Sequence, residues 1–563
     1  MPRINRRHAL ALMTGTALTS ACATPGEGAA QSATSEAPDP AVFRHGVASG
    51  DPDASSVVIW TRITTLASEV DVTWSVYDDP EMESLVASGA AKATDETDYT
   101  LKVVVDALQP GQTYYYRFEA EGTRSRLGRT QTLPVGAVDQ LGIALVSCSN
   151  YPFGFFNGYD AIARDPEIDF VLHTGDYIYE YGGPEGWGEE TASVIGRPHD
   201  PPHEIITLAD YRRRHAQYKS DSGSREMHAA HPLICCWDDH ESANNPWTDG
   251  AQNHQPETEG SWAARRAASI QAYYEWMPIR EPMPGRTRAQ FWRSYIFGDL
   301  ATLITLETRH TARGKQVDYA EWAPKLNTEE DYAAFRRDVL GDPDRHMISP
   351  TELEDISVAL SESVAKGQPW RVIGNQIPMA RMPVPDVIGL GVLPAPLETS
   401  LEAHKRLAWL GKHGLPFYTD TWDGYPVARE AFYDLCKANK ASDLLVLTGD
   451  SHSFWANILH DKSGENMGIE LGTAGITSPG DFVDSGFDAE TAKALDQVFS
   501  DQLPEVTWTD NFHQGYVRVV LYPDSAKASY VAVSTVLSPI YNTRTIKAFD
   551  IQTDGENLVL RQA

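Results

Sequence analysis

Short runs in which apolar and polar residues alternate fill the chain from residue 41 to residue 135. Pro, Gly and Asp separate these runs. Alternation with a period of two, broken by turn residues every ~8 to 12 positions, is typical of an antiparallel β-sandwich. We therefore predict an all-β sandwich domain over residues 35–136. Its clearest strand-like runs are residues 55–63, 70–77, 99–108 and 113–122.

A different pattern begins after residue 137, where continuous apolar runs end abruptly in polar residues. Such runs are typical of buried strands that present polar side chains at their carboxyl ends. Helical periodicity appears between them, in residues 261–276 and 351–364. We predict one large α+β domain over residues 137–563. Its strand-like runs are residues 141–149, 168–176, 231–240, 300–309, 370–376 and 442–452.

The first residues have the composition of a targeting sequence. Arg6 and Arg7 precede an apolar run, residues 9–23, that is shorter than the ~20 residues a membrane-spanning helix needs. We predict a twin-arginine signal peptide and linker over residues 1–34, with the twin-arginine export machinery as partner and a periplasmic or secreted location. A sequence similar to a lipoprotein cleavage site ends at Cys22, so lipidation there would anchor the protein to a membrane.

Composition excludes several classes of protein. The 563 residues are 42% hydrophobic and 10% aromatic, enough for packed cores, which excludes a disordered or fibrous chain. The chain has 47 Lys plus Arg against 78 Asp plus Glu, a net charge of −31. This acidity argues against nucleic acid as a partner. It also disfavours long-range attraction of anionic substrates, so an anionic substrate would need a cation within the site.

Residues that can bind metals recur where the apolar runs end. A single one would have an ordinary explanation, because a buried Cys packs as a small hydrophobe and an Asp caps turns and helices. Recurrence favours a metal site, since packed carboxylates repel one another and cations offset the repulsion. Asp and Asn oxygens suit Ca²⁺ or Mg²⁺, whereas a thiolate and a phenolate suit Fe³⁺. The residues are Cys148, Asp176, Tyr179, Asp238, Asp239, His240, Glu241, Asn244, Asn245, Asn375, Asp450 and His452.

Motifs spread over residues 41–555 identify a family. They are FRHGVASGDP (43–52), VSCSN (146–150), HTGDYIYEYG (173–182), WDDHE (237–241) with a following Asn-Asn, AYYEWMPIR (272–280), GNQ (374–376), TGDSHSFWA (448–456) and TSPG (477–480). Together, in this order, they resemble the PhoD family of alkaline phosphatases and phosphodiesterases, which is related to metallophosphoesterases and purple acid phosphatases. The resemblance implies a metallophosphoesterase-like α-β-β-α sandwich preceded by a fibronectin type III-like sandwich.

The same resemblance implies roles for individual residues. Cys148 would be a thiolate ligand of Fe³⁺, and Tyr179 would give the iron its phenolate. Asp176 would bridge the iron and a calcium. Asp450 and His452 would complete the cluster. The implied cofactors are thus Fe³⁺ and one or two Ca²⁺, with other divalent metals left open.

The resemblance also implies calcium ligands and a proton donor in and just after the motif WDDHE (237–241). Asp239 takes the place of the Asn in the related Gly-Asn-His-Glu motif and is the first choice for a calcium ligand. Asp238 and Asn245 are further candidates. His240 would lie near the substrate as hydrogen-bond donor or general acid for the leaving oxygen, or would support the carboxylates from behind.

Two arginines and two long loops complete the predicted site. Arg293 and Arg309 lie beside strand-like runs and fit bidentate contact with phosphate, with a structural salt bridge as the alternative for each. Residues 183–230 and 378–428 are expected to face the opening of the site. Apolar side chains of the second loop either wall a leaving-group pocket or pack in the core, and we favour packing: Pro378, Met379, Trp422 and Tyr425.

The predicted function is an exported hydrolase of phosphoric esters, acting on small-molecule or lipid phosphate esters through a metal-activated hydroxide or oxo nucleophile. A phospholipase D-like phosphodiesterase or a phosphotriesterase on the same centre is the first alternative. A non-catalytic, metal-stabilised anion-binding surface protein is an alternative of another class. The order of preference among monoesters, diesters and triesters stays open, and we expect a monomer.

Overall fold

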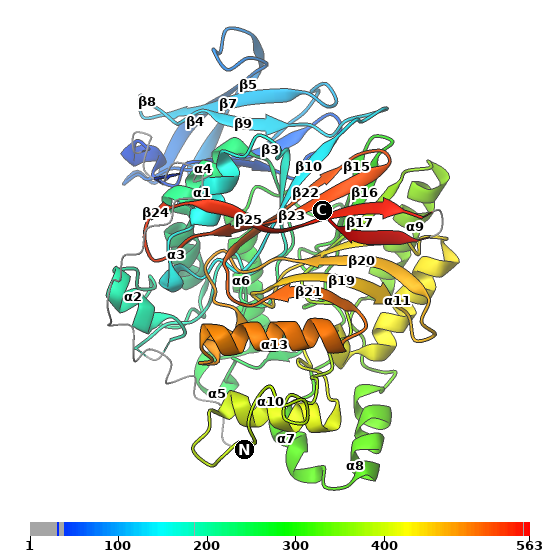
Figure 1. Cartoon of the computed structure of the whole chain (residues 1–563). Helices are drawn as coiled ribbons and strands as arrows, with labels where there is room; N and C mark the ends of the chain where they lie inside the picture. The colour runs from blue at the N-terminus through cyan, green and yellow to red at the C-terminus, as the bar shows by residue number, and fades with distance from the viewer. Residues whose placement is uncertain (1–30, 33–38, 185, 555–556) are drawn as a thin grey trace, which may run out of the picture.

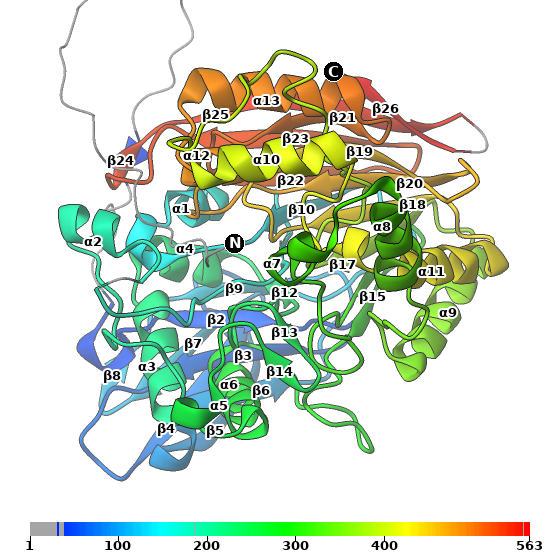
Figure 2. The same ribbon diagram turned by 90° about the horizontal axis from the view of Figure 1, so that it is seen from below.

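Two β-sheets stacked face to face form the centre of the computed structural model, with helices on both outer faces (Figure 1 and Figure 2). The structure describes residues 31–32, 39–184, 186–554 and 557–563. Cys22 and residues 1–30 of the predicted signal peptide lie outside the described residues.

The first sheet has ten strands, and four neighbouring strands, β10, β11, β12 and β2, are parallel. On one side β10 pairs antiparallel with β22, which begins an antiparallel meander. The strand order is β26 (Leu558–Gln562), β25 (Thr543–Thr553), β23 (Ser525–Val533), β22 (Gly515–Leu521), β10 (Leu141–Val146), β11 (Phe170–His173), β12 (Leu233–Cys235), β2 (Val47–Gly50), β3 (Val57–Arg62) and β6 (Thr100–Val105).

The second sheet has seven strands, of which β16, β17, β18 and β20 are parallel and the others antiparallel. The strand order is β15 (Arg293–Phe297), β16 (Ala301–Thr305), β17 (Trp370–Asn375), β18 (Leu444–Thr448), β20 (Asn466–Gly472), β19 (Phe454–His460) and β21 (Val506–Asp510). All six strand-like runs predicted after residue 137 thus contain a strand of one of these two sheets.

Continuous apolar runs form these strands because both faces of each sheet are covered. In β10, Ile143 and Leu145 belong to the core between the sheets, whereas Ala144 and Val146 pack with the helices outside. The helices on that side are α1 (Asn157–Ala163), α3 (Leu208–Lys219), α4 (Ser222–Ala230) and α6 (Trp262–Trp276), and those on the far side of the second sheet are α9 (Pro350–Ala365) and α11 (Pro426–Ala438).

Further helices lie around the sheets. In both views α10 lies beside α13, and the two share a hydrophobic cluster (Figure 1 and Figure 2). Within the described residues, no helix is long and apolar enough to cross a membrane. The remaining α-helices are α2 (Glu189–Ile195), α5 (Pro256–Glu259), α7 (Tyr319–Trp322), α8 (Glu329–Ala334), α10 (Glu402–His413), α12 (Asp481–Asp484) and α13 (Ala489–Gln502).

The N-terminal strands belong to two sheets that share one hydrophobic core, and the first of these continues into the ten-stranded sheet. β2, β3 and β6 extend the ten-stranded sheet, because β2 pairs in parallel with β12 at Gly50 and Leu233. A Cβ atom at position 50 would lie 2.6 Å from the Leu233 carbonyl oxygen, so this junction requires glycine. The second N-terminal sheet contains β5 (Leu85–Thr94), β4 (Glu69–Tyr77), β7 (Thr113–Ala120), β8 (Thr123–Arg124) and β9 (Gly128–Gln131).

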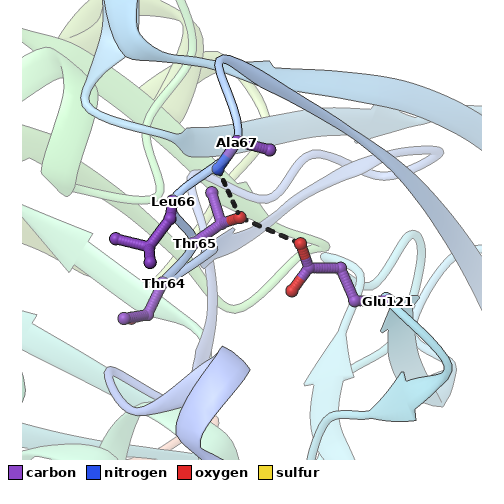
Figure 3. Close-up of a pocket in the computed structure, with 5 residues that line it drawn as sticks. All are labelled: Thr64, Thr65, Leu66, Ala67 and Glu121. Atoms are coloured by element: carbon purple, nitrogen blue, oxygen red, sulfur yellow. Dashed lines mark hydrogen bonds between the residues drawn. The ribbon is translucent and has the colours of Figure 1, made fainter.

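A shallow depression lies between two loops of the N-terminal region, one joining β3 to β4 and the other joining β7 to β8 (Figure 3). In it the Thr65 hydroxyl donates to Glu121 and accepts from the Ala67 backbone N–H, and the Leu66 side chain is fully exposed. The depression contains none of the predicted metal ligands.

One glycine sets the distance between the two sheets at their carboxyl ends. Gly449 follows β18, and a Cβ atom there would lie 2.3 Å from Ser147 Oγ and 2.6 Å from Thr174 Oγ1. We expect Gly449→Ala to lower the free energy of unfolding by about 1–3 kcal/mol, because the added methyl group overpacks a buried contact. Urea denaturation measures the change. Gly314→Ala is the control, since its nearest neighbour would lie at 3.6 Å, and equal stability losses in the two variants would contradict the argument.

Candidate metal centre

The predicted ligands leave both sheets at the same edge. Val146, His173 and Cys235 are aligned neighbours on β10, β11 and β12. The loops that follow these three parallel strands therefore begin side by side. An isolated bridge between Ser147 and Gly475 ties this edge to the segment that follows β20 of the second sheet.

Five of the eight predicted metal ligands have a left-handed backbone conformation. This conformation is unfavourable for residues with a side chain and persists where the surrounding structure enforces it, as at functional sites. It turns the chain sharply in the loops that carry these residues. The five residues, with φ between 51° and 65°, are Cys148, Asp176, Asn245, Asp450 and His452.

Three overlapping groups of side chains have the spacing of metal ligands, with the donor atoms of each group within 4.8 Å of one another. Asp176 belongs to the first two groups and Asp239 to the last two, so the groups form one continuous cluster. A shared carboxylate is the arrangement that bridges neighbouring ions. The groups are Cys148 with Asp176 and His452, Asp176 with Asp239 and His240, and Asp238 with Asp239 and Asp450.

Tyr179 joins the first group. Its hydroxyl lies 3.0 Å from Asp176 Oδ2, 2.9 Å from Ser478 Oγ and 3.4 Å from His452 Nε2. Cys148 Sγ lies 3.5 Å from the same Asp176 oxygen. Burial and the neighbouring Asp176 raise the pKa of both the thiol and the phenol well above their usual values, so neither ionises without a cation beside it.

Glu241 holds two of the ligand loops in place through backbone hydrogen bonds. Its carboxylate accepts from the N–H groups of Tyr177 at 2.6 Å, Asp238 at 2.8 Å and Asp176 at 3.1 Å. One buried side chain therefore connects the loop after β11 to the loop after β12. Burial raises the pKa of Glu241 to about 7, against the three donors, which favour its ionised form.

His240 is oriented by a buried carboxylate on its far side. His240 Nδ1 lies 2.7 Å from Glu180 Oε2, and Nε2 lies 3.8 Å from Asp239 Oδ2. The other Glu180 oxygen accepts from Asn244 N–H and Asn253 Nδ2, both at 2.8 Å. Burial would lower the pKa of His240, but Asp239 and Glu180 reverse that effect and raise it. These two carboxylates therefore favour the protonated form of the imidazole.

Arg309 lies inside the third group. Its fully buried guanidinium pairs with Asp238 through Nε and with Asp450, at 3.2 Å, through a terminal nitrogen. Asp238 Oδ2 and Asp239 Oδ1 are buried and, among the described residues, accept no hydrogen bond. A buried carboxylate oxygen without a donor is costly, and a bound cation would satisfy it. The residues present therefore fit metal ions.

The remaining pKa shifts have the same cause. Burial and the neighbouring carboxylates raise the pKa of Asp176 and of half-buried Asp450 well above the usual range. For Asp239, burial would raise the pKa, but the positive charges of His240 and Arg309 hold it below the usual range. The cluster therefore carries more acid groups than its own side chains can keep ionised.

Comparison with known proteins assigns this site to a family. The sequence profile described as PhoD-like phosphatase matches residues 143–530, and the profile of the PhoD-like phosphatase N-terminal domain matches residues 28–134. The chain belongs to the PhoD-like phosphatase family. This confirms the resemblance found in the sequence motifs, and it identifies the protein as a phosphoric ester hydrolase.

Two relatives of this PhoD-like phosphatase agree with the assignment. The chain is 33% identical over 536 residues to alkaline phosphatase D of Bacillus subtilis, covering 92% of this chain and 82% of the relative. A solved structure entitled "Structure of PhoD" superposes with a TM-score of 0.73 and 30% identity, covering 92% of each chain. The α-β-β-α arrangement is thus that of the family, whereas the fibronectin type III-like class of the N-terminal strands stays a prediction.

Not every predicted residue of this PhoD-like phosphatase lies in the cluster. Arg293 forms a partly buried ion pair with Asp51 at 3.4 Å and donates to the Arg280 carbonyl oxygen, so the alternative of a structural salt bridge describes it. Asn245 contributes its backbone N–H to Asp239, while its side-chain amide donates to Gln252.

The apolar residues predicted on the loop 378–428 also lie elsewhere. Met379, Trp422 and Tyr425 are buried in the core beneath α9 and α11. The indole N–H of Trp422 donates to Asn375 Oδ1 at 3.3 Å, so that strand-end amide supports the core as well. Packing, the alternative we favoured, therefore describes these side chains.

Sequence analysis missed the supporting roles of Glu180 and Glu241. Both lie one residue from a predicted site residue, within the motifs HTGDYIYEYG and WDDHE. A carboxylate next to a ligand is the available signal, but it does not say whether the side chain points into the cluster or behind it. Their partners, a histidine ring and three backbone N–H groups, become visible only in the fold.

We expect Glu180→Gln to lower kcat by about 10–100-fold, the usual effect of removing a group that orients an active-site residue. The side-chain NH₂ of Gln replaces one of the two carboxylate oxygens. That NH₂ group would then face either His240 Nδ1 or the N–H donors of Asn244 and Asn253, so at least one hydrogen bond is lost. Steady-state kinetics with metal analysis of the same sample checks this. Glu204→Gln removes a carboxylate that pairs with Arg265 instead, and it should leave kcat within about twofold. Wild-type kcat in Glu180→Gln would contradict the orienting role.

Proposed function

We propose that this PhoD-like phosphatase is an exported hydrolase of phosphoric monoesters and diesters that uses a mixed iron–calcium centre. The observation that carries the proposal is the chain of three overlapping ligand groups joined by Asp176 and Asp239. One end of the chain offers a thiol and a phenol, and the other offers carboxylates only. This difference in donor type favours two kinds of ion.

Each end suits a different ion. Cys148, Tyr179, Asp176 and His452 form the donor set proposed for Fe³⁺, because thiolate and phenolate ligands stabilise a strong Lewis acid. Asp239, with Asp176, is the donor set proposed for Ca²⁺, which prefers carboxylate oxygens. When bound, these ions supply Lewis-acid polarisation of the phosphoryl group and a nucleophilic oxygen derived from water.

The protein's own side chains then bind the substrate and move protons. His240, held by Glu180 with Nε2 toward the cluster, is placed to donate a proton to the leaving oxygen of the ester. Arg309 favours the ionised forms of Asp238 and Asp450 and adds positive charge beside the place where a phosphate would bind. Its ion pairs keep it at a fixed position, so its contribution needs no reorganisation during the reaction.

The cellular location is part of the proposal. The twin-arginine sequence predicts export to the periplasm or beyond the cell, where small-molecule and lipid phosphate esters would be the substrates. Cys22 would provide an anchor if lipidated. A fusion of residues 1–34 to a reporter that is active only after folded export tests this part. We expect reporter activity to be lost when Arg6 and Arg7 are both replaced by Lys, and unchanged activity in that variant would contradict export by the twin-arginine route.

Hydrolysis itself is tested with three esters, p-nitrophenyl phosphate, bis-p-nitrophenyl phosphate and phosphatidylcholine. We expect turnover of at least one of the first two, and at least a 100-fold loss after the metals are removed by chelation, because the cluster then lacks its Lewis acids. Restored activity with Fe³⁺ and Ca²⁺ is the control. Binding of phosphate without turnover of any ester would favour a non-catalytic anion-binding protein.

Tyr179→Phe tests the iron end of the centre. A phenolate bound to Fe³⁺ absorbs visible light, so the purified wild-type protein should be coloured and the variant should lose the band. Tyr177→Phe is the matched control, because it removes the hydroxyl of the other buried tyrosine in the same loop, which binds Ser224 and His228 instead. An absorption spectrum with metal analysis measures the result. A colourless, active wild-type enzyme would contradict the iron assignment.

A further inference from the structure

One half-buried indole, that of Trp187, lies over two imidazoles of the site. Trp187 lies on the loop between β11 and α2, and its ring stacks over His452, with centroids 5.4 Å apart and an interplanar angle of 20°. It is also nearly parallel to His240, at 6.5 Å and 26°. The two imidazoles that face the cluster thus share one aromatic cover.

Further contacts fix the position of this indole. Its N–H donates to Asp484 Oδ1, at 3.0 Å, on α12. The ring packs against Phe153 at 4.8 Å and Tyr179 at 5.6 Å. The hydrogen bond joins the loop after β11 to a helix almost 300 residues further along the chain, as its separation of 297 positions shows. The cover is therefore held from two sides, and Trp187 itself is only half-buried.

We propose that Trp187 is a specificity-determining residue that contacts the organic group of a phosphate ester bound at the cluster. This inference rests on the proposed function. A phosphoryl group held between the ligand groups and His240 directs its ester substituent away from the carboxylates, toward the aromatic cover. An indole face binds flat apolar groups well and offers little to a methyl group. The site should therefore prefer aryl esters to small alkyl esters.

The alternative is that Trp187 only supports the fold of its loop. In that case its removal would weaken all ligands alike, or would reduce metal content and stability. A comparison of two ligands that differ only in the organic group separates these roles. Phenylphosphonate and methylphosphonate serve, because neither can be hydrolysed at the phosphorus–carbon bond by simple ester cleavage.

The experiment measures the dissociation constants of both phosphonates by calorimetry on metal-loaded protein. In Trp187→Ala we expect phenylphosphonate to bind about tenfold or more weakly and methylphosphonate to change by less than about twofold, as for loss of an apolar contact. Trp187→Phe should recover most of the preference. Trp409→Ala is the matched control, since Trp409 is also half-buried and its indole N–H donates, at 3.0 Å, to Tyr332 on α8.

Each outcome decides between the roles. Equal weakening of both phosphonates in Trp187→Ala, or no preference for phenylphosphonate in the wild type, overturns the inference. Kinetics with p-nitrophenyl phosphate and methyl phosphate on the same samples keeps the proposed function separate. Selective phosphonate binding without ester turnover would support the role of Trp187 and contradict the hydrolase mechanism. Ester turnover without selective phosphonate binding would support the hydrolase function and contradict the role of Trp187.

Discussion

Repulsion among acid groups at the strand ends is the constraint on which the structure depends. Asp176, Asp238, Asp239 and Asp450 lie in overlapping groups with donor atoms within 4.8 Å. At such distances two like charges cost about 4 kcal/mol in the effective medium of a protein surface, and more in its interior. Arg309 offsets part of this cost through its ion pairs. Multivalent cations would offset the rest, and the donor atoms of the cluster have the spacing of metal ligands.

The two-sheet fold can hold this unfavourable cluster because the stability of the fold comes from its hydrophobic cores. Large cores between and outside the sheets hold the parallel strands in register, so their carboxyl ends meet at one edge. Cores of this kind support left-handed backbone conformations that would otherwise relax. Glu241 then fixes the spacing of two ligand loops through their backbone N–H groups. These two loops are thus held through their backbone, in addition to the ion pairs that the ligand side chains form with Arg309.

Sequence analysis predicted the strands and the ligand cluster because both are local consequences of burial. A strand covered on both faces is apolar throughout, and a polar residue can first appear where the strand leaves the core. Cys148 and Asp176 follow this rule. The junction of Gly50 with Leu233, which joins the N-terminal strands to the catalytic sheet, has no such local signal, since two distant segments define it. Alternation within each strand, on which the predicted N-terminal sandwich rests, carries no information about this junction.

The two arginines show the same limit. Both lie near the active end of the second sheet, since Arg293 pairs in register with Thr305, the last residue of β16. Arg293, however, begins the edge strand β15 and meets Asp51, whereas Arg309 follows a strand inside the sheet and enters the cluster. The order of strands in the sheet decides the role of each arginine, and this order cannot be deduced from the pattern of residues near either one.

The net charge of −31 misleads about substrate charge for a related reason. Surface charges beyond about 8 Å are screened at physiological ionic strength, so they influence the rate of substrate approach. Affinity depends instead on charges within the site, where Arg309 lies and where metal ions would bind.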